Sequence, residues 1–473
     1  MPETPAIESK SIDWVPLDER RGKPSTLFPL WFMSNANLTT LATGMVGAAL
    51  GASLVTSLVA IVLGAAVGTV FTAFHSAQGP QLGLPQMIQS RAQFGYRGVV
   101  VICAVVVFSI VGFNVFNQIL AADVLTLATG TDLRDLWFVL ITACALTLAI
   151  YGYHWIHRFQ TWLTWLFLAT FGVFTVAALI WLDVPAGQFG FGGFTWAGFL
   201  VQFGAAAAYE LGWAPYVSDY SRYLPTSQGG AKTFWFTLIG SCAGAILFMS
   251  LGAVVGVYAL DSLSSDAIVY LSSLSPVGAP VIAIVLVLGM IGANCDNLYG
   301  PYLAGLSTVT QAGGPAHVSK VLRGAVTGAF GVLGTAIGIF LSGDFLTNLQ
   351  NLILLLLYML VPWTAINLVD FYLIHRGRYD VGAIVSMRGR YGLVNWKAIG
   401  TYAVAVIAQI PFMSCALFVG PVATALGGVD IAWLVGLFVA GILHYALNRS
   451  AAAEDGDLPV TPITATSAAT ATA

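Results

Sequence analysis

The sequence predicts an all-α integral membrane protein with twelve transmembrane helices, in which two inverted repeats of five helices are followed by two extra helices. Three observations support this fold class: the composition, the apolar stretches, and the placement of polar and positively charged residues. Only 8% of the residues are charged and 58% are hydrophobic, whereas a soluble domain carries about 25% charged residues. Lipid must therefore surround much of the surface.

The apolar stretches define the predicted helices, because one bilayer crossing needs about 20 apolar residues. Twelve stretches approach this length. The first ten form a core of residues 27–369, with the two repeats expected at 27–182 and 196–369. The predicted spans are, in chain order, 28–51, 54–74, 99–122, 136–153, 161–182, 196–217, 233–258, 278–303, 322–341, 346–369, 398–420 and 431–447.

The remaining segments are polar. Residues 1–26 contain charges and prolines and do not resemble a cleavable signal peptide. Residues 370–397 form a basic loop, which we expect in the cytoplasm, and residues 398–447 hold the two extra helices. Residues 448–473 are rich in alanine and threonine, so we expect a disordered cytoplasmic tail.

The orientation follows from lysine and arginine, which accumulate in cytoplasmic loops. If the N-terminus lies in the cytoplasm, every lysine and arginine except Arg134 falls on the cytoplasmic side. A wrong number of spans would place the positive residues on both sides of the membrane, so the bias also supports the predicted number of spans. The sequence therefore predicts a multi-pass protein of the cell (inner) membrane with both termini in the cytoplasm.

Two spans contain features that break a helix. The first span carries Ser34, Asn35, Asn37, Thr39 and Thr40 close together, and such side chains compete with the backbone for hydrogen bonds. The sixth span contains Glu210, Gly212 and Pro215 in an apolar run, and proline lacks the backbone donor that a helix needs. Two interrupted helices five spans apart indicate an inverted-repeat transporter, since an odd offset reverses the polarity of the second repeat.

Spans three and eight, again five apart, also contain polar residues. Phe113 and Asn117 are four residues apart in span three, and Asn294 and Asn297 are three apart in span eight, so each pair shares a helix face. Aromatic faces and amides suit a planar ligand such as a nucleobase, since amides pair with base edges. The predicted midplane site comprises Phe113, Asn117, Trp213, Asn294, Asn297, Asn35, Asn37 and Thr39, with the acids Glu210 and Asp296 nearby.

Three motifs carry a family resemblance. They are LWFMSNANLTTLATG in the first span, GPQLGLPQMIQSRAQFGYRG from Gly79 to Gly98, and GWAPYVSDYSRYLP from Gly212 to Pro225. On these motifs the chain resembles the nucleobase–cation symporter-1 family, in its purine–cytosine permease branch.

The resemblance implies a leucine-transporter-like fold and cation symport by alternating access. It also implies that a base is held between aromatic side chains of spans three and six, while amides read its edge. Carried onto this sequence, the aromatics are Phe113 and Trp213, and the amides are Asn117 and Asn297.

Two departures from the family pattern concern the coupling ion. Sodium-coupled relatives carry adjacent hydroxyls where this chain has Ile291 and Gly292, which supply no side-chain oxygen. Fungal-type permeases have a glutamate at the position of Gln160. These departures favour proton coupling over sodium. The coupling candidates are Glu210, Asp296 and Gln160, and because Gln160 cannot be protonated in place of the glutamate, Glu210 or Asp296 would carry the proton.

Other interpretations of these residues stay open. The asparagines could pack between helices or cap the broken span, the aromatics could be ordinary packing, and Glu210 could be a permanently neutral acid. Arg91, Asp219 and Arg222 lie near the cytoplasmic ends of spans and are candidates for a gate or a structural ion pair.

The same residues are compatible with other functions. The same fold could carry allantoin, a hydantoin, uracil, a nucleoside or a thiamine-like cofactor. A membrane enzyme or sensor is disfavoured, because the sequence has no Ser/His/Asp triad, HExxH motif or Cys/His cluster, and because its polar ends are short. The net charge of −3 argues against nucleic-acid partners. We expect no metal and no cofactor other than a coupling ion.

Overall fold

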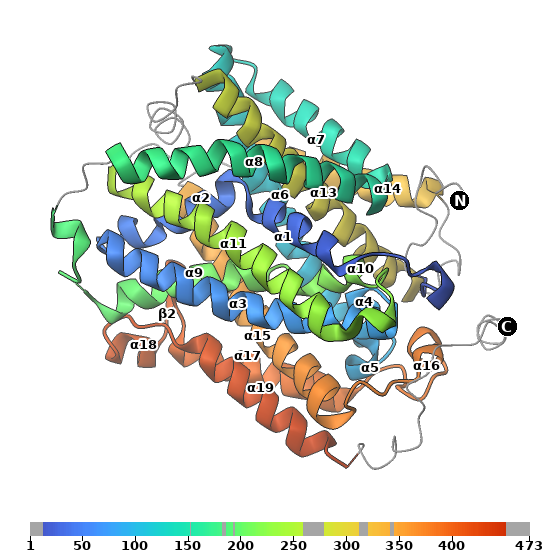
Figure 1. Ribbon diagram of the computed structural model, residues 1–473. Helices are drawn as coiled ribbons and strands as arrows, with labels where there is room; N and C mark the ends of the chain where they lie inside the picture. Colours follow the sequence, from blue (N-terminus) through green and yellow to red (C-terminus); the bar gives the residue numbers. More distant parts are fainter. Residues whose placement is uncertain are drawn as a thin grey trace.

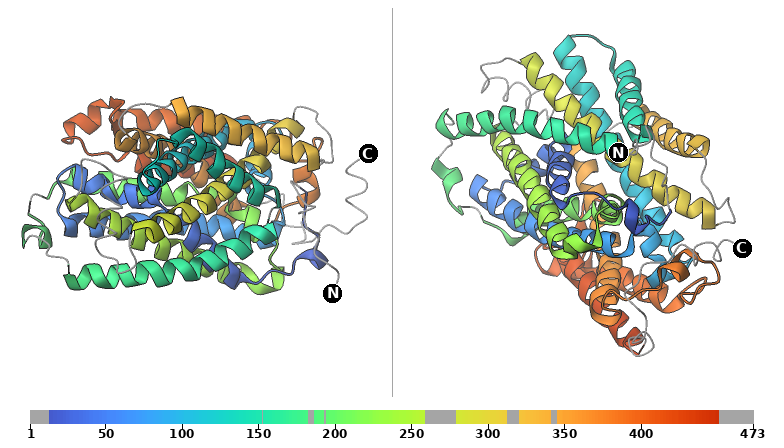
Figure 2. Two further views of the ribbon diagram at one scale, coloured as in Figure 1. Left: turned by 90° about the horizontal axis from the view of Figure 1, so that it is seen from above. Right: turned by 45° about the vertical axis from the view of Figure 1, so that its right-hand side comes forward.

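The protein is described by a computed structural model in which the helices form a single elongated bundle (Figure 1). The long helices cross the molecule between two ends where the loops collect (Figure 2). The predicted disordered tail, from residue 451 onward, and residues 1–12 lie outside the described residues. The structure describes residues 13–151, 153–181, 186–192, 194–258, 279–311, 320–340 and 345–450.

The helices follow the predicted order of two five-span repeats. The first repeat consists of α1 (Leu27–Asn35) and α2 (Leu38–Ala49), which together make the first span, then α3 (Leu54–Leu82), α6 (Val100–Thr129), α7 (Arg134–Tyr151) and α8 (Tyr153–Trp181). The second consists of α9 (Trp196–Leu211) and α10 (Val217–Ser221), then α11 (Gly229–Tyr258), α13 (Ala279–Gln311), α14 (Lys320–Phe340) and α15 (Phe345–Leu368). The extra helices are α17 (Trp396–Gln409) and α19 (Ala432–Asn448).

Short elements connect these helices. They are α4 (Gln86–Gln89), α5 (Arg91–Phe94), α16 (Val381–Val385), α18 (Pro421–Ala425), and an antiparallel pair of strands, β1 (Ser414–Cys415) and β2 (Phe418–Val419). The predicted span 398–420 is α-helical only to Gln409. A 3-10 turn containing Pro411 and the two strands replace its second half.

Six helices within the described residues are long and apolar enough to cross a bilayer by length and composition. The other predicted spans coincide with helices that are shorter, interrupted or only partly within the described residues. The two interrupted helices are those of the first and sixth spans, as the polar residues and Pro215 predict.

The helices pack in two groups. In the first group, α11 contacts α1, α2 and α3, and α3 contacts α9 and α10. In the second group, α6, α7, α13 and α14 contact one another. Glycine allows the closest approach in the first group, because a Cβ at Gly44 would clash with the carbonyl oxygen of Met249 on α11.

The segments predicted to be cytoplasmic meet at one end of the bundle. Arg20 Nη1 donates to the Pro80 carbonyl at 2.6 Å, and the Tyr96 amide donates to the Gly392 carbonyl at 2.9 Å. The N-terminal segment, the Gly79–Gly98 motif and the basic loop therefore share one side, as the distribution of positive charge predicts.

A buried polar cluster at this end joins the last helix to the core. Asp370 lies in a π-helical extension of α15, Val369–Ile374. Its carboxylate contacts His444 of α19 at 2.9 Å and His375 at 3.1 Å, and it accepts a hydrogen bond from Tyr379 at 2.5 Å. This link between the extra helices and the repeats was not predicted from the sequence.

Candidate functional site

The interruption of the first span comes from its own polar residues. α1 ends at Asn35, and Asn37 caps α2 by accepting a hydrogen bond from the Thr40 amide at 3.0 Å. The Asn37 side-chain nitrogen donates back to the Ser34 carbonyl at 2.8 Å. Asn37 thus satisfies the hydrogen-bonding groups of the backbone at the break. This is the helix-capping role that the sequence left open for it.

The interruption of the sixth span follows from Pro215. α9 ends at Leu211, a 3-10 turn spans Ala214–Tyr216, and α10 continues from Val217. Pro215 lies at the start of that turn, where its missing backbone donor costs least. The break places Trp213 between the two helical halves, facing span three.

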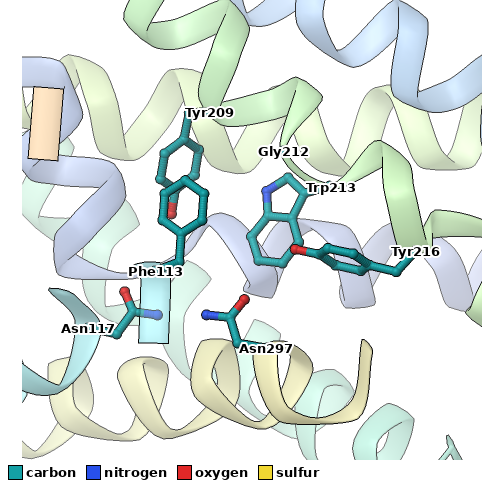
Figure 3. A pocket seen from close by; sticks show the side chains of 7 residues that line it. All are labelled: Phe113, Asn117, Tyr209, Gly212, Trp213, Tyr216 and Asn297. Carbon is teal, nitrogen blue, oxygen red and sulfur yellow. The ribbon is translucent and has the colours of Figure 1, made fainter. Parts of the chain in front are cut away.

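The broken spans enclose a pocket together with α6 and α13 (Figure 3). Four of the predicted binding residues come together there, namely Phe113, Asn117, Trp213 and Asn297. Their side chains are all buried, so the pocket is closed in this conformation. The full lining is Phe113, Asn117, Tyr209, Gly212, Trp213, Tyr216 and Asn297.

Three lining residues were not singled out as binding residues. Tyr209 precedes Trp213 by four positions and Tyr216 follows it by three, so both flank the break of the sixth span, and this closeness to Trp213 could have identified them. Gly212 leaves room for the aromatic opposite, because a Cβ there would lie 3.4 Å from the Phe113 ring and 3.1 Å from the Tyr209 carbonyl oxygen.

The aromatic walls meet edge to face. Phe113 and Tyr209 have ring centroids 5.4 Å apart at an interplanar angle of 80°. Trp213 and Tyr216 are 5.6 Å apart at 79°. Edge-to-face contact is a geometry that aromatic pairs prefer. It leaves flat ring faces available to a planar ligand.

The two pocket amides have different partners. Asn117 Oδ1 accepts a hydrogen bond from the Thr39 hydroxyl at 2.5 Å, and Figure 3 shows its nitrogen pointing toward Asn297. Asn297 Oδ1 is buried without a hydrogen-bond partner in the described part of the chain. A buried polar atom without a partner is costly, so a ligand that donates to Asn297 Oδ1 would satisfy that atom, and the same ligand could accept from the neighbouring Asn117 nitrogen.

The other predicted contacts lie behind the pocket wall. Asn35 Oδ1 accepts from the Trp213 indole nitrogen at 3.3 Å, and Thr39 holds Asn117 as described above. Asn294 does not line the pocket, and both polar atoms of its amide are buried without a partner among the described residues. The structure therefore separates lining residues from those that position them.

The two candidate acids lie outside the pocket lining. Glu210 Oε2 accepts from the Thr69 and Ser241 hydroxyls at 2.7 and 2.6 Å. Asp296 Oδ2 accepts from Ser34 at 2.8 Å.

The third coupling candidate, Gln160, contacts one of these acids. Gln160 Nε2 donates to Asp296 Oδ2 at 2.9 Å. A Cβ added at Gly292 would lie 3.4 Å from both polar atoms of the Gln160 side chain. An amide therefore lies beside the position where sodium-coupled relatives are expected to carry a hydroxyl.

The gating candidates lie at the loop-rich end. Asp219 accepts from the Gln86 backbone amide at 2.8 Å. Arg222 Nε donates to the Asp219 backbone carbonyl at 3.2 Å. Arg91 is buried, with its guanidinium 4.1 Å from the Tyr96 ring centroid. None of the three lines the pocket.

Within the residues that the structure describes, no group of three or more His, Cys, Asp or Glu side chains is placed to hold a metal ion. The pocket's polar groups are amides and phenol hydroxyls. Its chemistry is that of recognition by hydrogen bonding and ring contact.

Comparison with known proteins agrees with this arrangement. A family model described as "permease for cytosine/purines, uracil, thiamine, allantoin" matches residues 14–436. The chain is 37% identical to the putative purine-cytosine permease YxlA of Bacillus subtilis over 444 residues, which cover 94% of this chain and 96% of that protein. It is 25% identical to the purine-cytosine permease fcyB of Emericella nidulans, over 93% of this chain and 88% of that one.

The fold is that of known transporters. The nucleobase-cation-symport-1 family transporter Mhp1, in a closed conformation with bromovinylhydantoin bound, superposes with a TM-score of 0.75 at 20% identity, over 96% of this chain and 97% of that one. The inward-facing conformation of Mhp1 superposes with a TM-score of 0.69 at 19% identity, over 97% of each chain. The expected leucine-transporter-like architecture is thereby confirmed, and the similarity is greater to the closed conformation.

Proposed function

Because this chain belongs to the family of permeases for cytosine/purines, uracil, thiamine and allantoin, we propose that it imports a nucleobase, cytosine or a purine, into the cell. The family establishes a membrane transporter and not an enzyme. The choice of substrate class follows from the pocket and from the purine-cytosine permeases among the relatives.

One observation carries the proposal. Asn117 presents its amide nitrogen, and Asn297 an unpartnered amide oxygen, at the floor of a pocket with aromatic walls. A nucleobase offers a flat ring and adjacent donor and acceptor atoms on one edge, which is the complement of this set. The base would lie between Phe113 and Trp213, with its polar edge toward the two amides.

The transport cycle that we propose is proton symport by alternating access. Broken helices at the midplane are the usual site of substrate binding in inverted-repeat transporters, and the two groups of helices rock around it. Proton coupling is favoured because Gly292 and Ile291 offer no side-chain oxygen for sodium. The protein would lie in the cell (inner) membrane with both termini in the cytoplasm, as the distribution of positive charge suggests.

Uptake by a permease-deficient strain tests the substrate. Cells expressing the protein should take up labelled cytosine, adenine, guanine or hypoxanthine, and Asn297→Ala should abolish that uptake, because it removes the amide that pairs with the base edge. If none of the four bases enters the cells and Asn297→Ala leaves the uptake of other compounds unchanged, the proposal is wrong.

A hydantoin is the second candidate. The solved relative Mhp1 holds bromovinylhydantoin, and a hydantoin ring is also planar with alternating donors and acceptors. A panel of unlabelled competitors against one transported base, including hydantoins, allantoin, uracil, nucleosides and thiamine, separates the two. Ligand binding also raises the apparent thermal stability of a protein in detergent, so a thermal-shift screen gives an independent ranking of the candidate ligands.

The coupling ion has its own test. Uptake should collapse when the proton gradient is dissipated and should not require sodium. Uptake that persists without a proton gradient but stops when sodium is removed would overturn the interpretation of Gly292 and Ile291.

A further inference from the structure

The two acids near the pocket differ in which helices they connect. A residue that couples an ion to transport must have different contacts in different conformations, because a ligand shifts an equilibrium only through its differential affinity for the states. Contacts within one rigid group of helices stay the same when that group moves. Contacts between the groups change.

Glu210 makes its contacts within the first group of helices. Its carboxylate accepts hydrogen bonds from Thr69 on α3 and Ser241 on α11. Its backbone carbonyl accepts one from Thr72, also on α3. Since α3, α9 and α11 pack against one another, these bonds persist when the group moves as a body.

Asp296 connects the two groups. It lies on α13, in the second group, and its Oδ2 accepts from Ser34 of α1 at 2.8 Å. Its Oδ1 accepts from Tyr220 of α10 at 3.2 Å. Both donors belong to broken helices of the first group. The third donor, Gln160, lies on α8, which packs against both α1 and α13.

The hydrogen-bond partners of Asp296 in the described residues carry no positive charge. Its three hydrogen-bond donors are neutral, and within the described residues no lysine or arginine forms a salt bridge with it. The titratable groups near Asp296 include, in the described part of the chain, Cys295 on its own helix and Tyr216 and Tyr220 on the broken sixth span. Tyr220 in turn contacts Tyr299 of α13 and His157 of α8, at ring-centroid distances of 5.4 and 6.1 Å.

We propose that Asp296 binds the coupling proton, and that its bonds to Ser34 and Tyr220 tie protonation to the relative movement of the two helix groups. Glu210 is then a structural acid of the first group. This inference rests on the proposed function as a proton symporter, and it assigns the coupling to one of two candidate residues.

The step is a simple proton transfer. One O–H bond forms on the Asp296 carboxylate with a proton from the side to which the site opens, and the same bond breaks when the proton leaves on the other side. In the closed arrangement three donors stabilise the charged carboxylate. Separation of α1 and α10 from α13 removes two of these donors and changes the burial of the carboxylate, so its proton affinity differs between the two arrangements. Protonation therefore shifts the equilibrium between them.

The position of Asp296 also connects the proton to the substrate. Asp296 directly precedes Asn297, whose amide lines the pocket. A change in the bonds that hold this turn of α13 against the first group therefore also moves the amide that is expected to read the base.

Reconstituted vesicles test the assignment. With an inwardly directed proton gradient and no sodium, wild-type protein should concentrate labelled cytosine. Asp296→Asn should exchange labelled for unlabelled cytosine yet lose concentrative uptake, because it keeps the side-chain volume and removes the titratable group. Asp296→Glu should retain concentrative uptake. The matched control Glu210→Gln should concentrate cytosine like the wild type.

A second set of variants keeps the carboxyl and does not depend on the folding of Asp296→Asn. Tyr220→Phe and Ser34→Ala each remove one donor, so each should shift the pH profile of cytosine exchange toward higher pH. Thr69→Val removes a donor from Glu210 instead and should leave the profile in place. An infrared difference spectrum against pH should show a carboxyl band that Asp296→Asn lacks, and this measurement needs no substrate.

The outcomes distinguish the inference from the proposed function. If the wild type concentrates cytosine and Asp296→Asn does so equally, the assignment to Asp296 is overturned while proton symport stands. Loss of concentrative uptake in Glu210→Gln alone, or equal pH shifts in Tyr220→Phe and Thr69→Val, would also overturn it. If the wild type takes up no base, the proposed function fails, and the infrared band alone decides whether Asp296 titrates.

Discussion

The indole nitrogen of Trp213 donates a hydrogen bond to Oδ1 of Asn35 at 3.3 Å. Asn35 is the last residue of α1, and Trp213 directly follows the break after α9, so this bond joins the two interrupted helices. The nitrogen of the Asn35 amide donates in turn to the Ser241 hydroxyl at 2.9 Å. Asn35 therefore orients the aromatic wall of the pocket from behind.

The first prediction concerns this pair. Asn35→Ala should weaken base binding roughly fivefold, since one hydrogen bond contributes about 1 kcal/mol and the indole then loses its fixed orientation. Trp213→Phe keeps a ring and removes the donor. If both losses come from this one hydrogen bond, the double variant should bind the base only slightly more weakly than the single variant with the lower affinity, as measured in a competition assay. Fully additive losses would show that the two side chains act independently.

The second prediction concerns the orientation of Asn117. Thr39→Val keeps the shape of the side chain and removes the hydroxyl that holds Asn117 Oδ1. We expect roughly fivefold weaker binding, because the amide is then free to rotate away from the ligand. Thr39→Ser retains the hydroxyl and should bind like the wild type. A loss in Thr39→Ser but not in Thr39→Val would mean that the methyl group, and not the hydrogen bond, matters.

The third prediction separates the two tyrosines of the pocket. The Tyr209 hydroxyl accepts from Thr40 at 2.8 Å, so Tyr209→Phe should lower the free energy of unfolding by about 1 kcal/mol. Figure 3 shows the Tyr216 hydroxyl directed toward Trp213 and the pocket. Tyr216→Phe should therefore leave thermal stability near the wild-type value and change the ranking of competing bases. The reverse pattern would contradict this division.

The fourth prediction tests the close packing of α2 and α11. Gly44→Ala places a methyl group against the Met249 carbonyl oxygen, and such overpacking costs about 1–3 kcal/mol. The variant should unfold at a lower temperature in detergent. Gly328→Ala on α14 is the matched control, since a Cβ there meets no atom within 4 Å, and it should be at least as stable as the wild type. A smaller loss in Gly44→Ala than in Gly328→Ala would contradict the packing argument.

Much of the architecture is predictable from local sequence. The apolar runs and the positive charges predict the number, order and polarity of the spans, because the bilayer imposes length and composition on each helix separately. The two interruptions are predictable for the same reason, since Pro215 and the polar residues after Ser34 act on their own backbone. The family motifs place Phe113, Asn117, Trp213 and Asn297, which the structure brings into one pocket.

The roles of the remaining polar residues depend on partners that are distant in sequence. Asn35, Asn37 and Thr39 look alike in the chain, yet Asn37 caps a helix, Asn35 orients Trp213 and Thr39 holds Asn117. Glu210 and Asp296 are likewise equivalent as isolated acids in apolar spans. The sequence by itself therefore determined the order of the helices and their two breaks. Only the tertiary structure decided which polar groups line the pocket and which acid joins the two helix groups, because a hydrogen bond is defined by the position of both its partners.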